Sequence, residues 1–249
     1  MSFTSFFKDQ DGEDAGTTEG HRQSEYDFHM HHGLNDQWML RANVPFVYKR
    51  LTMTGEEAIN TQGIGDITLG ATYQVKPKMD DKVLLSAMFD LKLPTGANSI
   101  KSASGERLEE HSQIGTGSTD FSVGLVATSE LKSGDLVFAG LSTRLNGKNR
   151  EGYRYGNVVF YNLGYSHKAS DSGSFVLELN GRFAGKDRTE DGSKDENSGG
   201  HFGYLSFSYR QSLAKDYGLV GTYQFPVFRS LNGSQRESGL LTLGVYKRL

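Results

Sequence analysis

Charged side chains of both signs recur at every second position within several short segments of this chain of 249 residues. Side chains two residues apart lie on the same face of a β-strand. Charges on one strand face must either line water or pair with one another, because an unpaired buried charge is strongly destabilising. We therefore expect the following residues to line a wet or ion-paired interior: Arg41, Asp90, Lys92, Arg144, Glu178, Arg182 and Arg210.

Two histidines raise the question of a metal site. His29 and His31 fall on one strand face, where two imidazoles could approach the same ion. The chain has no cysteine, and Asp27 is the one obvious carboxylate on that face. A polar strand face beside a turn at 33–36 is the favoured interpretation. We expect no bound metal, and His29 and His31 are the weak candidates for one.

Catalytic constellations are also not expected. Nucleophilic catalysis needs a nucleophile beside a histidine that a third group orients. A twelve-stranded phospholipase barrel carries a His-x-Ser-Asn-Gly type run, and neither the residues after His167 nor those after His201 fit it. The glycines at 63–66 open a strand with no helix behind it, which excludes a phosphate-binding loop. We expect no enzyme and no cofactor.

The elements that would position these side chains are β-strands. Between residues 81 and 93, apolar side chains occupy the odd positions, and polar ones such as Ser86 and Asp90 occupy even positions. This alternation predicts a strand with one apolar and one polar face, and it recurs along the whole chain. We expect about twelve strands, near residues 2–9, 19–33, 37–50, 63–76, 82–94, 116–130, 135–146, 152–168, 173–185, 199–213, 217–229 and 238–249.

Composition narrows the class of protein. The mean hydropathy is -0.52, and no stretch approaches about 18 consecutive apolar residues, which excludes a transmembrane helix. A transmembrane β-barrel remains, because only every second residue must be apolar while the other half faces a polar lumen. The 27 basic and 30 acidic residues nearly balance, so no nucleic-acid partner is expected.

The two strand faces fit such a barrel. One face is apolar enough for lipid along 38–48, 67–75, 121–127, 159–165, 219–227 and 241–245. Aromatic residues near strand ends, such as Trp38 and Tyr165, resemble the girdles of membrane barrels, although aromatic residues are also good strand formers. The polar face also carries apolar residues that predict a constriction or an apolar binding site: Val126, Leu136, Phe138, Val158, Phe160 and Val176.

The connections between the strands alternate in length. Short turns at 33–36, 76–81, 131–134, 169–173 and 214–216 separate long polar stretches at 10–18, 51–62, 95–115, 186–198 and 230–237. This matches short periplasmic turns and long extracellular loops. The expected fold is an all-β, single-domain (1–249), transmembrane, antiparallel up-and-down barrel. Both termini would then lie at the short-turn end.

Three motifs in residues 60–130 carry a family resemblance. Gly63-Ile-Gly-Asp66 opens one strand, Leu91-Lys-Leu-Pro-Thr-Gly96 closes the next, and a Gly-Thr-Gly-x-x-Asp run ending at Asp120 opens the one after. In this order and spacing they resemble the outer-membrane barrels grouped as meta-pathway phenol-degradation proteins. From physics we expect the glycines to allow bulges or close strand approach at the rim, and the aspartates to cap amides, pair with arginine or attract cations. The rim residues are Gly63, Gly65, Asp66, Gly115, Gly117 and Asp120.

The resemblance implies an outer-membrane transporter or channel for small, sometimes aromatic, compounds. Its partners would be the lipid bilayer and a small-molecule solute. Residues 1–8 lack the basic start and apolar run of a signal peptide, so an exported chain would already have lost it. The alternatives are a non-conducting scaffold barrel with a plugged lumen that binds an envelope protein, and a soluble β protein.

Overall fold

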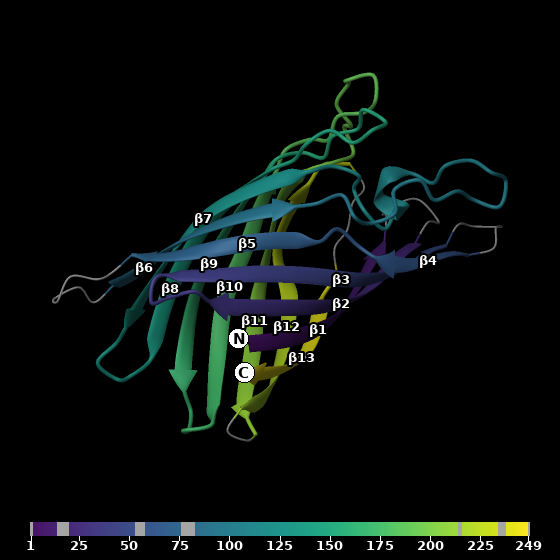
Figure 1. The fold of residues 1–249 in the computed structure, drawn as a ribbon. Helices are drawn as coiled ribbons and strands as arrows, with labels where there is room; N and C mark the ends of the chain where they lie inside the picture. The colour runs from purple at the N-terminus through teal and green to yellow at the C-terminus, as the bar shows by residue number, and fades with distance from the viewer. Residues whose placement is uncertain are drawn as a thin grey trace.

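The alternating pattern becomes one large antiparallel sheet. The computed structural model describes residues 2–13, 20–52, 58–75, 83–213, 216–233 and 238–248, with only the backbone at 2–13, 20–22 and 248. Its strands are β1 (Ser2–Glu13), β2 (Gly20–Gly33), β3 (Trp38–Thr52), β4 (Ile59–Ile64), β5 (Thr68–Val75), β6 (Val83–Lys92), β7 (Asp120–Glu130), β8 (Leu136–Leu145), β9 (Val158–Lys168), β10 (Gly173–Ala184), β11 (Gly200–Ser212), β12 (Tyr217–Leu231) and β13 (Leu240–Arg248). Sequence neighbours pair everywhere except at β4 and β5, which both pair with β3, and this confirms the up-and-down topology (Figure 1).

The sheet closes on itself. β1 pairs with β13 on one side and with β2 on the other, and β2 pairs with β3. β3 pairs with both β4 and β5 along its length. β4 and β5 are thus two halves of one wall segment, interrupted at residues 65–67, where one strand was expected over 63–76. The ring therefore has the twelve wall segments that the sequence predicts.

The outer face of this ring is apolar. On it, Leu125 is 53% exposed, Leu141 60% and Leu163 60%. Exposed apolar side chains, aromatic ones included, are spread around the wall from β2 to β13, as expected for contact with lipid rather than water. Among the described residues, no helix is long and apolar enough to cross a membrane.

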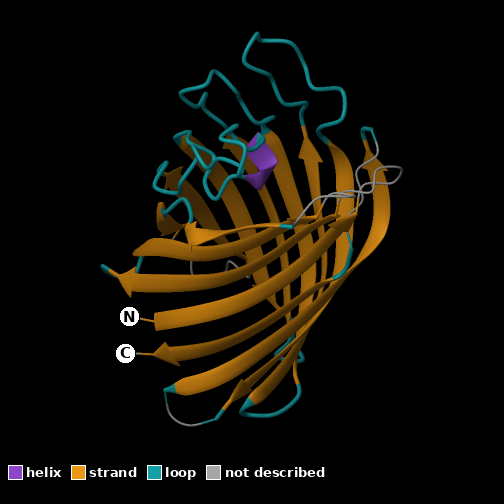
Figure 2. Cartoon of the chain, turned by 90° about the vertical axis from the view of Figure 1, so that its right-hand side faces the viewer, coloured by secondary structure: helices purple, strands orange, loops and turns teal. Residues whose placement is uncertain are grey.

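The connections gather by length at the two ends of the ring. Figure 2 shows the long loops together at one end, hereafter the loop end, and short turns at the other, the turn end. Strands β1 and β3 run on to Glu13 and Thr52, so the loops expected at 10–18 and 51–62 are shorter than predicted. The turns expected at 76–81 and 214–216 lie wholly or mostly outside the described residues.

Buried apolar side chains concentrate at the loop end rather than along the barrel axis. Val47 and Leu51 on β3 are 5% and 8% exposed, and Leu108 and Ile114 in the β6–β7 connection are 7% and 6% exposed. This connection therefore folds back onto the wall, and the two form a small hydrophobic core between them. We call its residues 93–119 the lid.

Candidate functional site

The inner face carries the expected charges, and a first pair crosses the wall between β3 and β6. The Arg41 guanidinium lies 2.7 Å from Asp90 Oδ1. The intervening strand contributes Gly70, where a Cβ would stand 2.1 Å from that carboxylate oxygen. A side chain at this position would break the pair, so the glycine is what lets a bridge span three strands.

Two further arginines line the wall at β8 and β10. Arg144 stacks over the Phe160 ring at 5.2 Å, and Arg182 over the Phe202 ring at 5.8 Å. Each cation thus has an aromatic face as a partner. Arg210, near the turn end, is exposed on the same inner face.

Uncharged polar groups cover the wall from β9 to β12. Asn162 donates to Glu178 at 2.7 Å, the one charged acceptor of this region among the hydrogen bonds of the described residues. Ser206 accepts from both Asn180 and Gln224 at 2.7 Å. The interior therefore combines charged side chains with amide and hydroxyl groups, and the amides and hydroxyls are concentrated between β9 and β12.

Water reaches these inward side chains. Arg41 and Asp90 are 23% and 27% exposed although they face inward and bridge each other. Arg144 and Arg210 are more exposed still, at opposite ends of the interior. These inward side chains are therefore accessible to solvent at several levels of the barrel.

The three motifs named above meet in one cluster at the loop end, which we call the rim knot. Asp66, between β4 and β5, accepts from the Gly96 amide at 3.0 Å and the Thr116 amide at 2.8 Å. Lys92 lies 3.4 Å from Asp66 and also forms an ion pair with Asp120. The three charged side chains are 7%, 15% and 3% exposed, in the order Asp66, Lys92, Asp120. Lys92, expected in the lumen, thus belongs to the rim.

Glycines make this knot compact. A Cβ on Gly115 would lie 2.6 Å from Gly96 Cα and 2.6 Å from Asp66 Oδ1. Gly117 has φ +69°, and a Cβ there would collide with Asn98. These two positions accept glycine alone, and they fix both ends of the lid to the wall. Gly65 packs against Pro45, and Gly63 faces Ile114 of the lid.

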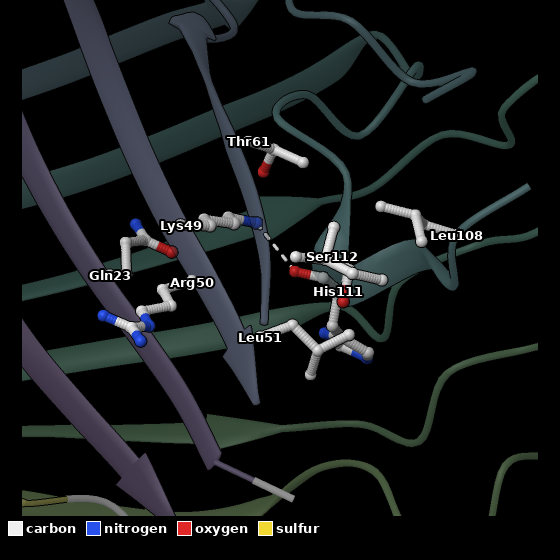
Figure 3. A pocket seen from close by; sticks show the side chains of 9 residues that line it. Gln23, Lys49, Arg50, Leu51, Thr61, Leu108, His111 and Ser112 are labelled. Carbon is white, nitrogen blue, oxygen red and sulfur yellow. Dashed lines mark hydrogen bonds between the residues drawn. The ribbon is translucent and has the colours of Figure 1, made fainter. Parts of the chain in front are cut away.

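The lid reaches from its own strands to β3. Its short 3₁₀ turn, Glu110–Ser112, lies inside the ring of strands at the loop end (Figure 2). Lys49 of β3 donates to the carbonyls of His111 at 2.7 Å and Gln113 at 2.6 Å. Figure 3 shows the Lys49 side chain extended toward this turn. One lysine thus holds the lid against the wall two strands away.

On its other side the same turn binds the β8–β9 loop. The Glu110 carboxylate receives two hydrogen bonds from Arg107, at 2.7 and 3.1 Å, and one from Asn149 at 3.1 Å. The Tyr155 hydroxyl donates to the Glu110 carbonyl at 3.0 Å. Glu110 is 8% exposed, so its charge depends on these partners.

A second buried carboxylate ties the lid to the β10–β11 loop. Asp187 accepts from the Tyr153 hydroxyl at 2.6 Å and the Gly156 amide at 2.7 Å, and lies 3.3 Å from His111 Nε2. Burial alone would lower the pKa of His111, but the hydrogen bond and charge of Asp187 raise it above its usual value. Burial favours the neutral form of Asp187, yet its hydrogen bonds lower the pKa of that carboxyl. The pair is therefore held in its charged form.

The histidine pair of β2 gives a separate result. The His29 and His31 rings share the inner face with centroids 6.4 Å apart. Among the described residues no group of three or more His, Asp or Glu side chains is arranged to hold a metal ion.

Sequence reasoning missed the lid anchors. No motif distinguishes Lys49 from the other charged residues of the chain, and Glu110, His111, Tyr153 and Asp187 lie in loops that show no periodicity. A usable signal was present, because apolar and aromatic residues are unusual in otherwise polar loops.

The chain matches known proteins at the level of family and fold. Residues 7–223 match the family described as "Putative MetA-pathway of phenol degradation". No curated protein showed a significant match.

Among solved structures, an outer membrane channel from Pseudomonas putida F1 is similar, with TM-score 0.74 and 12% identity over 99% of this chain and 94% of that one. The KdgM porin has TM-score 0.56 and 10% identity, over 100% of this chain and 99% of its own. The CymD monoaromatic hydrocarbon channel has TM-score 0.51 and 9% identity, over 100% and 88%. These likenesses confirm the outer-membrane β-barrel fold.

Proposed function

The chain belongs to the family described as "Putative MetA-pathway of phenol degradation", and we propose that it is a passive outer-membrane channel for small organic solutes, aromatic ones included. The loop end would be extracellular and the turn end periplasmic. No chemical step is assigned to the chain, which we propose is not an enzyme.

The observation that carries the proposal is the set of solvent-accessible charges on the inner face. Exposed inward charges extend from Arg144 near the loop end to Arg210 near the turn end, with the Arg41–Asp90 bridge between them. Selectivity in such a pore follows from lining charges and the narrowest apolar contact. The likeness to a monoaromatic hydrocarbon channel and the inward Phe138 and Phe160 support the inclusion of aromatic solutes.

The lid supports a second candidate, a barrel whose lumen is closed and which binds an envelope protein. The lid crosses the loop end from β3 to the loop after β10 and is fixed at several points. In that case the lid would block the lumen rather than select among solutes. Both candidates place the same protein in the membrane, and they differ in conductance.

The test is ion selectivity in planar bilayers. We expect steady single-channel openings, and a shift toward cation preference when Arg182 and Arg210 are both replaced by Glu, because like charges are excluded from a lined pore. Reversal potential in a salt gradient measures this shift. Arg188→Glu, in an exposed loop position, is the matched control and should leave the potential unchanged. A folded barrel with no single-channel openings would favour the second candidate, the closed barrel that binds an envelope protein.

A further inference from the structure

A small hollow lies between the lid and the β3–β4 hairpin. Lys49, Leu51 and Thr61 line it from the hairpin, and Leu108 and His111 line it from the lid (Figure 3). Its empty volume, which includes solvent at the open side, is about 340 Å³. It therefore stands at the loop end, where a solute entering the barrel would meet the protein first.

The hollow contains a buried hydroxyl group that lacks a partner. Thr61 is 9% exposed, and among the described residues nothing forms a hydrogen bond with its Oγ1. Thr61 pairs in register with Lys49, so the two side chains share the inner face. In Figure 3 the hydroxyl points toward the Lys49 side of the hollow. A buried hydroxyl without a hydrogen-bond partner destabilises the folded protein. A ligand with a polar group at this position would remove that cost.

Lys49 has hydrogen-bonding capacity beyond its lid contacts. An ammonium group has three N–H donors, and the His111 and Gln113 carbonyls occupy two of them. The third is left for an oxygen of the ligand. Lys49 and Thr61 thus offer two neighbouring donors to one ligand group.

The other residues that line the hollow indicate the charge of the ligand and the polarity of the rest of it. Lys49, Arg50 and His111 are basic, and among the described residues no carboxylate lines the hollow. Glu25, Glu109 and Asp66 act on the Lys49 charge from outside the lining. Leu51, Ile59 and Leu108 supply an aliphatic wall. An anionic head beside the donors and a compact apolar body against the leucines satisfy all of these groups.

We propose that this hollow binds a small organic carboxylate, with its carboxylate on Lys49 and Thr61 and its apolar body against Leu51, Ile59 and Leu108. The inference rests on the proposed channel function and names the solute class that the mouth selects. The lid then acts as one wall of a recognition site.

The test is calorimetric titration of the full-length barrel in detergent with benzoate, and with benzamide as its neutral counterpart. We expect benzoate to bind and benzamide to bind much more weakly. Thr61→Val removes the hydroxyl while keeping the side-chain shape, and should weaken benzoate binding about tenfold, as expected for one hydrogen bond to a charged group. Its unfolding temperature should not fall, because that hydroxyl has no partner to lose. Thr143→Val, on the outer face of β8, is the matched control.

Equal binding of benzoate and benzamide, or unchanged affinity in Thr61→Val, would overturn the inference. Planar-bilayer recordings separate it from the channel function. Conductance without benzoate binding would leave the channel and remove the site. Benzoate binding without conductance would leave the site and remove the channel.

Discussion

Two connections at the turn end have polar contacts within a few residues, whereas the rim knot at the loop end draws its partners from 30 to 50 residues away. The turn after β2 closes when Asn35 accepts from the amides of Gln37 and Trp38, at 2.9 Å each. The turn after β9 holds a Lys168–Asp171 ion pair at 2.8 Å. By contrast, Asp66 accepts from Gly96, 30 residues away, and from Thr116, 50 residues away. These two turn contacts can thus form locally, whereas the rim knot forms only when distant strands are aligned.

The largest expected effect comes from removing the cation of the rim knot. Lys92→Met leaves the buried Asp66 and Asp120 carboxylates facing each other without a counter-charge. We expect a loss of about 3–5 kcal/mol in the free energy of unfolding, the cost of breaking a buried ion pair. Urea unfolding followed by heat-modifiable gel mobility measures it.

Lys168→Met is the matched control at the turn end, where both partners of the ion pair are exposed. No measurable change is expected, because exposed pairs contribute little. Equal losses in Lys92→Met and Lys168→Met would remove the distinction between the two ends.

A smaller and more local effect is expected from Asp187→Ala. This change leaves the Tyr153 hydroxyl and the Gly156 amide buried without their acceptor, at a cost of about 1–3 kcal/mol each. The loss should appear as faster hydrogen exchange of residues 146–157 and 185–199, with β10 unaffected. Exchange that rises equally throughout the barrel would show that the loops unfold with the wall rather than by themselves.

The smallest effect is a pH dependence of the lid. Because the folded-state pKa of His111 is raised, the His111–Asp187 pair stabilises the lid fully below the unfolded value of about 6.5. That stabilisation is lost as the pH rises through the raised pKa. Asp187, Glu109 and Lys49 act on the ring, the first two raising and the last lowering its pKa.

A spin label on Ser104→Cys reports this motion, since the chain has no cysteine of its own. We expect the label to be more mobile at about pH 9 than at about pH 6, and His111→Gln to abolish the difference. If the mobility of the label in the parent chain is independent of pH, the His111–Asp187 pair does not hold the lid in place.

The same contrast separates what sequence can predict from what it cannot. Period-two alternation placed the strands and both faces, because each residue's side is fixed by its parity. The alternation predicts that Arg41 and Asp90 share a face. It does not predict their ion pair, because that contact depends on Gly70 between them. The motifs predict that Asp66 and Asp120 lie at the rim. Their shared ion pairs with Lys92 depend on how far neighbouring strands are offset along the barrel, which the motifs do not specify. The break between β4 and β5, where the outward positions change from even at Ile64 to odd at Leu69, was also missed, because one strand with a single parity was expected over 63–76.

The position of the lid contacts bears on how such a ring could be assembled. Every described anchor of the lid lies between β3 and the loop after β10, whereas the first and last strands, β1 and β13, meet on the far side of the ring. The mouth can therefore be completed while the seam between β1 and β13 is still open. Insertion into the bilayer can end with the zipping of that seam, without any rearrangement of the finished entrance.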